Sequence, residues 1–178
     1  MTERAEQVWR DEFERLSAKR GALAPKLVFL PTWWPGRSVA FAYFNLIAIG
    51  SGLLRAPPDV RRYLLAHELG HIERGHTLGQ VGYWASVLSA VAIGQLLPPA
   101  LATAPIMAVL MGAVAWLSLG ETRREFEADD VAAARFGDQL VINGLNWMQA
   151  RRSEAASKLS TRRLERRRAH LAASIRGI

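Results

Sequence analysis

The stretch AHELGHIERGH, residues 66–76, decides how this chain is interpreted. Its histidines can share a metal ion only if the stretch is a helix. His67 and His71 are four residues apart, so on a helix both imidazoles lie on one face and can bind a single zinc ion. Glu68 lies beside the first of them. The pattern H-E-x-x-H therefore predicts a metal site in which Glu68 takes the proton of a water molecule held by the metal and passes it to a leaving amine.

A catalytic zinc site also needs a third protein ligand. Neither His76 nor His170 has a suitable spacing, whereas the segment ETRREFEADD, residues 121–130, is rich in carboxylates. Glu125 and Asp129 share one helix face there. We predict that Glu125 ligates the metal and that Asp129 accepts the outer N–H of a ligand histidine. The other carboxylates of this segment fall on other helix faces and are expected in solvent: Glu121, Glu127 and Asp130. Among these, Glu121 is the nearest alternative to Glu125 as the third ligand.

Length and composition narrow the classes of protein. The 178 residues are enough for one domain with a moderate core. The absence of cysteine excludes a disulfide framework, a thiolate zinc site and a cysteine nucleophile. Residues 1–20 are charged and do not resemble a secretory signal peptide. The net charge of +7 arises within residues 151–178, so the basic character belongs to the C-terminal segment.

Periodicity and turn residues predict a mainly helical chain with a few short strands. Asp59 is a plausible N-cap for the zinc-binding helix, which we expect from Val60 to about His76. The other helices are predicted at residues 3–19, 121–135, 139–150 and 151–175. The strands are predicted at residues 26–30, 38–44 and 46–50.

A long uncharged run separates the two metal motifs. Residues 75–120 contain no Asp, Glu, Lys or Arg, and Pro98-Pro99 divide the run into segments 81–97 and 100–119. Each segment approaches the ~20 apolar residues that span a bilayer. Basic residues at both outer ends would place those ends in the cytoplasm. We therefore predict a transmembrane helical hairpin over residues 81–119, with a buried hairpin of a soluble oligomer as the alternative.

Taken together, LLAHELGHIERGH, two apolar helices and RREFEADDVAA resemble the HtpX-like and CAAX-prenyl-protease group of membrane zinc metallopeptidases. The match covers residues 52–150. The resemblance implies that His67, His71 and Glu125 are ligands, that Glu68 is the catalytic acid and base, and that Asp129 supports a ligand. It also implies an edge strand within residues 38–50 on which an extended peptide lies. The family often has a further motif near its C-terminal end. The corresponding stretch here, TRRLERRRAHL at residues 161–171, keeps its arginine as Arg167, which the resemblance implies as a further residue supporting the ligands.

The predicted fold is α+β and mainly α. The zinc helix packs on a small β-sheet, and the hydrophobic hairpin is inserted between the two zinc motifs. We expect one metallopeptidase domain over residues 1–178, with the hairpin at 81–119 and a basic C-terminal helix within 151–178. The predicted function is a zinc-dependent endopeptidase with one Zn²⁺ per chain. It would cut protein or peptide substrates at the cytoplasmic face of the cell inner membrane.

Two other interpretations remain open at this point. One is a soluble oligomeric metallopeptidase, and the other is a non-catalytic membrane-associated binding protein with a structural metal site. The intact Glu68 favours an enzyme, because a structural site does not need a carboxylate beside the metal. The basic C-terminal segment favours anionic membrane lipid as a partner. Its lack of interleaved aromatic residues argues against nucleic acid.

Overall fold

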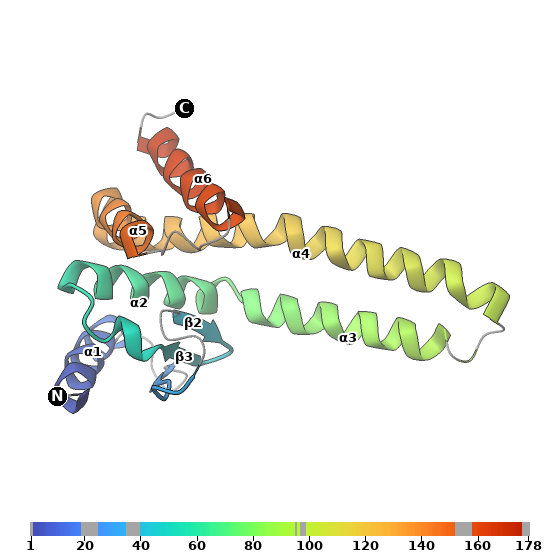
Figure 1. The fold of residues 1–178 in the computed structure, drawn as a ribbon, viewed down its shortest axis with the longest axis horizontal. Helices are drawn as coiled ribbons and strands as arrows, with labels where there is room; N and C mark the ends of the chain where they lie inside the picture. The colour runs from blue at the N-terminus through green and yellow to red at the C-terminus, as the bar shows by residue number, and fades with distance from the viewer. Residues whose placement is uncertain are drawn as a thin grey trace.

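The computed structural model describes residues 2–18, 25–34, 40–94, 96, 99–151 and 158–175. Figure 1 shows a group of short elements from which a long pair of helices projects. The elements follow in chain order as α1 (Thr2–Ser17), β1 (Lys26–Phe29), β2 (Ala40–Tyr43), β3 (Leu46–Ile49), the 3₁₀ turn η2 (Ser51–Leu53), α2 (Pro58–Glu73), α3 (His76–Gly94), α4 (Pro99–Phe136), α5 (Asp138–Arg151) and α6 (Lys158–Ile175).

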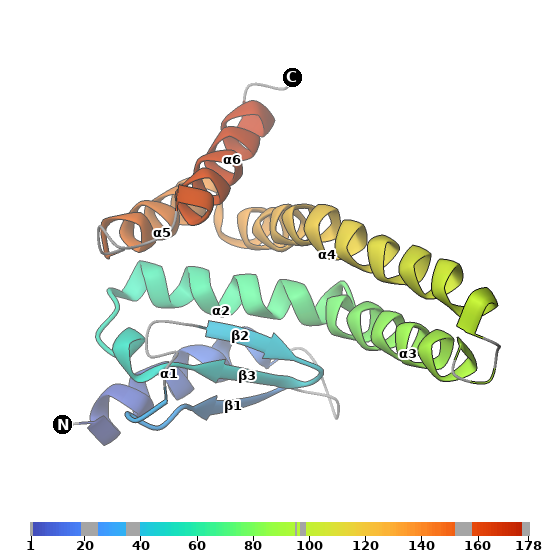
Figure 2. The ribbon, with the colours of Figure 1, turned by 45° about the vertical axis from the view of Figure 1, so that its right-hand side comes forward.

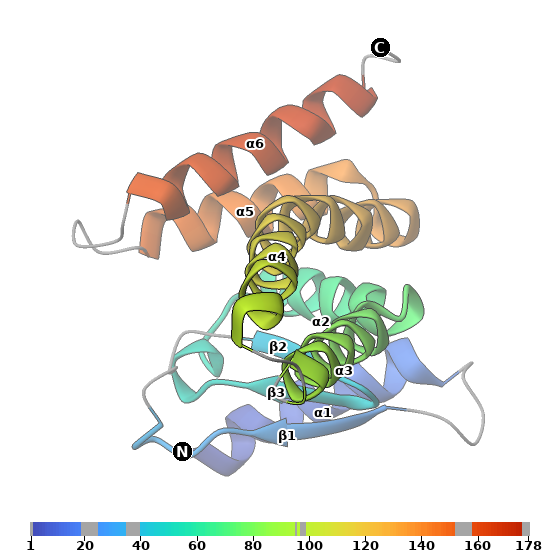
Figure 3. The same ribbon diagram turned by 90° about the vertical axis from the view of Figure 1, so that its right-hand side faces the viewer.

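The elements are stacked in layers around α2. Seen along the helical hairpin, α1 and the sheet lie on one side of α2, and α4 lies on the other, followed by α5 and α6 (Figure 3). The helix that carries H-E-x-x-H is thus the central element. It can present one face to the sheet and another to α4, which carries the second motif.

The sheet is small and mixed, with the strand order β1-β3-β2. β1 pairs with β3 in parallel, and β2 pairs with β3 antiparallel through a two-residue turn at Phe44 and Asn45. The three predicted strands are confirmed, although residues 38 and 39 of the second prediction lie outside the described residues. A mainly helical fold with the zinc helix beside a small sheet is therefore what the sequence predicted.

The core extends from α1 and the sheet across α2 to α4, α5 and α6. Trp9 and Phe13 lie one turn apart on α1 and are both buried. The indole nitrogen of Trp9 donates a hydrogen bond to the Leu54 carbonyl at 3.3 Å. From Tyr63 to Gly70, every residue of α2 is buried. Burial on all sides makes α2 a rigid support for the site.

Both ends of α2 differ from the prediction. The helix begins at Pro58, one residue before the predicted N-cap Asp59, because the fixed φ of proline suits the first helical position. It ends at Glu73, short of His76. Gly75 follows with a φ of +65°, a left-handed conformation that ends the helix, and α3 begins at the next residue.

The two helices of the predicted hairpin are present as α3 and α4, which pack along one another and extend away from the sheet (Figure 2), but the prediction that they span a membrane is not supported. Of its predicted turn, residues 97 and 98 lie outside the described residues. α4 runs without interruption from Pro99 to Phe136, so the predicted separate helix at 121–135 is the last part of the same helix. Within the described part of the chain, no helix combines the length and the apolar character needed to cross a membrane.

Candidate metal centre

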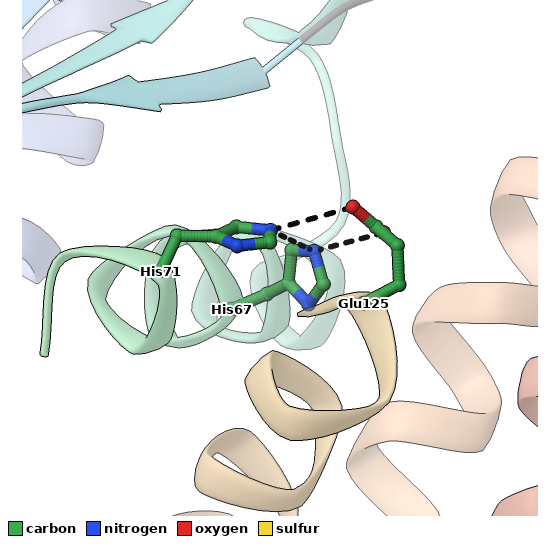
Figure 4. Close-up of side chains that lie close together, drawn as sticks. All are labelled: His67, His71 and Glu125. Carbon is green, nitrogen blue, oxygen red and sulfur yellow. Dashed lines mark hydrogen bonds and ion pairs between the residues drawn. The ribbon is translucent and has the colours of Figure 1, made fainter. Parts of the chain in front are cut away.

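His67, His71 and Glu125 come together where α2 packs against the second half of α4. Figure 4 shows both imidazoles and the carboxylate turned toward one another. The Nε2 atoms of the two histidines are 3.2 Å apart. Glu125 places Oε2 at 3.4 Å from His67 Nε2 and Oε1 at 3.5 Å from His71 Nε2. Among the described residues, these three form the one group of side chains whose ligand atoms are close enough to share a metal ion.

The spacing of these atoms fits zinc. Tetrahedral zinc with bonds of about 2.0–2.2 Å places neighbouring ligand atoms about 3.3–3.6 Å apart. The separations here are 3.2 Å between the two imidazole nitrogens and 3.4 and 3.5 Å from these nitrogens to the two different oxygens of Glu125, and one ligand atom from each residue lies within 4.8 Å of the others. Two imidazoles and one carboxylate are also a donor set that catalytic zinc sites use, with one position left for water or substrate. The residues present therefore fit a zinc ion.

A glycine within the first motif permits this close approach. A methyl group at Gly70 would lie only 3.1 Å from both the Cα and the carbonyl oxygen of Ala128 on α4. Such a contact is tighter than ordinary packing allows, so a larger residue would push α2 and α4 apart. Gly70 thus keeps the two histidines within reach of Glu125.

His67 is held from behind by Asp129. The Nδ1 atom of His67 lies 2.9 Å from Asp129 Oδ1, and the Asp129 side chain is completely buried. Asp129 also accepts hydrogen bonds from the Tyr63 hydroxyl at 3.0 Å and from Arg167 at 2.7 Å. The structure thus brings together the two residues that the sequence analysis expected to support the ligands, Asp129 and Arg167.

Arg167 reaches this site from α6. Its side chain is only 11% exposed, although it belongs to a helix rich in basic residues, and its Nη1 lies 2.7 Å from Glu125 Oε2. Arg167 therefore contacts both motif carboxylates of α4. A basic segment that could have been entirely solvated contributes one buried cation to the site.

The electrostatics of the site favour a cation at its centre. Burial and the charge of Arg167 lower the pKa of His67, but hydrogen bonds with Asp129 and Glu125 outweigh them and raise it to about 9. Burial also raises the pKa of Asp129, yet hydrogen bonds from Arg167 and His67 bring it down to about 2. Positive charge between these carboxylates is thus favourable, and a zinc ion would supply it.

Glu68 lies next to the ligands and is 5% exposed. Burial raises the pKa of its carboxyl group above the ordinary value. A carboxylate with a raised pKa can take a proton and return it more readily than a solvated one. Its position and environment suit the role of general base that the sequence predicted.

His71 has a different environment behind it. Its Nδ1 lies 2.7 Å from His76 Nδ1, and His76 Nε2 lies 3.0 Å from Glu127 Oε2. Glu127 was expected in solvent; its side chain is 31% exposed, but it also pairs with His76 and accepts a hydrogen bond from Arg123. The pairing was not predicted, and it arises because His76, at the first residue of α3, lies against the face of α4 that carries Glu127.

Asp130 is the other acidic residue of the second motif whose side chain the structure describes, and it pairs outside the ligand group. Asp130 is 46% exposed and lies 3.0 Å from His170 Nε2. The side chain of Glu121 lies outside the described residues. Sequence reasoning also missed Tyr63, although it precedes His67 by four residues and therefore shares the helix face of both histidine ligands.

The family of the chain follows from a direct comparison. A family model described as peptidase family M48 matches residues 6–157, which includes both metal motifs and the hairpin between them. The chain belongs to peptidase family M48. No curated protein and no solved structure matches it.

Membership of family M48 confirms the resemblance drawn from the sequence and makes this chain a metallopeptidase, an enzyme that hydrolyses peptide bonds. M48 peptidases depend on a metal ion, typically zinc, and the His67, His71 and Glu125 group supplies a place for it. A non-catalytic binding protein is therefore not the best interpretation.

Proposed function

We propose that this M48 peptidase is a zinc-dependent endopeptidase that binds one Zn²⁺ per chain and cuts proteins or peptides at a membrane surface. The observation that carries the proposal is the ligand triangle of His67, His71 and Glu125 beside the buried carboxylate of Glu68. Zinc supplies Lewis-acid chemistry, because it polarises a carbonyl group and makes water more acidic.

The side chains of the chain would divide the remaining work. Glu68 takes a proton from the attacking water and delivers it to the leaving amine nitrogen, and its raised pKa suits both transfers. Asp129 orients His67, while Arg167 fixes the carboxylates of Asp129 and Glu125. Proton transfer would thus belong to Glu68, and the support of the metal ligands to Asp129 and Arg167.

An extended substrate would lie along β2. This strand is at an edge of the described sheet, where its outer side pairs with no other described strand and can receive a peptide. A cavity of about 250 Å³ opens between the strand turn and His71, lined by Phe44, Asn45, His71, Ile72, Gly75 and Thr77. Phe44 has a φ of +51°, which is unusual for a bulky residue and is often found at functional sites. A substrate side chain beside the scissile bond could occupy this cavity.

The Glu68→Gln variant tests the proposed chemistry. Glutamine keeps the shape of Glu68 but cannot accept a proton, so cleavage of casein or a peptide mixture should be abolished while one zinc remains bound. Asp130→Asn, which changes an exposed carboxylate of α4, is the matched control and should cleave normally. A Glu68→Gln protein that loses its zinc, or that cleaves at the wild-type rate, contradicts the assigned role.

We further propose attachment to the cytoplasmic face of the cell inner membrane, with membrane lipid as a partner. The uncharged run of residues 75–120 supports it, as do large apolar side chains exposed on the projecting hairpin, Trp84, Leu88, Leu96, Met107 and Met111. The protein should fractionate with membranes and resist carbonate extraction, whereas a variant with residues 81–119 replaced by a short polar linker should not. Wild-type protein that is monodisperse without detergent would instead favour the soluble hairpin.

A further inference from the structure

His76 lies outside the ligand triangle but is connected to it. Its side chain is 11% exposed, and its two ring nitrogens face two different partners, His71 and Glu127. We call the series His71–His76–Glu127 the histidine relay. His76 comes from the first residue of α3 and Glu127 from α4, so the relay connects three helices.

The distances determine where the protons of the relay lie once His71 binds zinc. Its Nε2 faces His67 and Glu125 and must be unprotonated to bind a metal, so the proton of the neutral His71 ring is on Nδ1. That N–H faces His76 Nδ1 at 2.7 Å, and this atom must be the acceptor because two N–H groups would repel. The proton of His76 is then on Nε2, which donates to Glu127 Oε2 at 3.0 Å.

The turn at Gly75 makes this geometry attainable. His76 follows His71 by five positions, so a continuous helix would turn the two side chains to different faces. The left-handed φ of +65° at Gly75 interrupts the helix, and His76 starts a new one beside the last turn of α2. The change of direction brings the two imidazoles to a ring-centre distance of 5.0 Å.

We propose that His76 is a positioning residue for the metal centre. It forms a hydrogen-bonded link between the carboxylate of Glu127 and the zinc ligand His71, and so holds His71 in the tautomer and orientation that zinc requires. The proposal rests on the proposed zinc peptidase function. Ligand histidines generally donate their outer N–H to a carboxylate, a carbonyl or water. At His71 a second histidine stands between the ligand and the carboxylate.

Zinc affinity of the full-length chain is the direct test, measured by competition with a chromophoric chelator. His76→Ala should retain one zinc but bind it about 10–100-fold more weakly, as is typical when the outer partner of a ligand is lost. His76→Asn should recover part of this loss, because its amide oxygen lies near the position of Nδ1 and can accept from His71. Glu127→Ala should fall between His76→Ala and the wild type.

The pair His170 and Asp130 supplies a matched control. It has the same contact as His76 and Glu127, a histidine Nε2 at 3.0 Å from a carboxylate oxygen, and His170 also stacks on Phe126, but among the described contacts neither residue touches a ligand side chain. His170→Ala should therefore bind zinc as the wild type does. With Co²⁺ in place of zinc, the visible spectrum of His76→Ala should shift and that of His170→Ala should not, a difference that a purely structural role would not produce.

The outcomes separate this proposal from the proposed function. His76→Ala protein that binds zinc within twofold of the wild type, with an unchanged Co²⁺ spectrum, overturns the positioning role. A folded His76→Ala protein that binds no zinc also overturns it, because His76 would then be a ligand. Wild-type protein that binds zinc but cleaves no substrate refutes the peptidase function and leaves the affinity comparison intact.

Discussion

The two histidine ligands are supported in different ways, although both depend on carboxylates of α4. His67 contacts Asp129 directly, and that carboxylate is completely buried with Arg167 and Tyr63 around it. His71 reaches Glu127 only through His76, and Glu127 is 31% exposed. We call these the direct support and the relayed support. The direct support is part of the folded core as well as of the site, whereas the relayed support can change with less effect on the fold.

This difference has an energetic reason. Removing the buried carboxylate of Asp129 takes away one of the two carboxylates that neutralise the buried Arg167 and leaves only Glu125 of that pair, which is costly in a medium of low polarity. A half-exposed carboxylate leaves partners that water can still solvate. Stability and metal affinity should therefore change together at the direct support and separately at the relayed one.

The largest effect is expected from Glu125→Ala, because both histidine ligands face this carboxylate. Zinc affinity should fall by more than the 10–100-fold typical of losing an outer partner, since a ligand itself is removed. Cleavage activity should be lost at ordinary zinc concentrations. Titration with a metal chelator measures the affinity, and Asp130→Ala is the control on the same helix. If Glu125→Ala binds zinc as tightly as the wild type, another residue is the third ligand.

Asp129→Ala should combine a loss of affinity with a loss of stability. Zinc binding should weaken about 10–100-fold because His67 loses its outer partner. Breaking the buried pair with Arg167 should also cost about 3–5 kcal/mol of unfolding free energy. Urea unfolding of chelator-treated protein measures this cost without the contribution of bound zinc.

Glu127→Ala is the comparison for that experiment. It should weaken zinc binding through the relayed support while changing the unfolding free energy by less than about 1 kcal/mol, as is usual for exposed ion pairs. If the two variants lose stability equally, the distinction between the direct and the relayed support is wrong.

The sequence was sufficient for the parts of the site that lie within one helix. Spacing of four residues placed His67 with His71 and Glu125 with Asp129, and the structure brings all four together. The short strands were predictable because runs rich in β-branched and aromatic residues were separated by turn residues. These features depend on local geometry, which a sequence pattern describes well.

The errors arose where one helix meets another. Glu127 points away from Glu125 on an isolated helix, so spacing alone assigned it to solvent, yet the start of α3 brings His76 against it. Gly75, directly before His76, was the available signal that the chain changes direction there. The continuity of α4 through Glu121 was also missed, because the change from apolar to charged residues suggested a boundary that the backbone does not have.

The smallest expected effect tests the turn that creates the relayed support. Gly75 and Gly137 both have a left-handed φ, +65° and +85°, and a Cβ at either position would have no atom within 4 Å. Alanine at either site should therefore cost about 1–2 kcal/mol of unfolding free energy through backbone strain alone.

Only one of these two glycines orients a residue of the relay. Gly75 precedes His76 at the junction of α2 and α3, whereas Gly137 joins α4 to α5. Strain at position 75 can relax by shifting His76 away from His71, whose Nδ1 lies 2.7 Å from that of His76. Gly75→Ala should therefore weaken zinc binding several-fold, which is less than the 10–100-fold expected when an outer partner is lost completely. Gly137→Ala should lose similar stability and bind zinc normally. Equal zinc affinities for two variants with equal loss of stability would mean that the turn at Gly75 serves the fold and not the metal site.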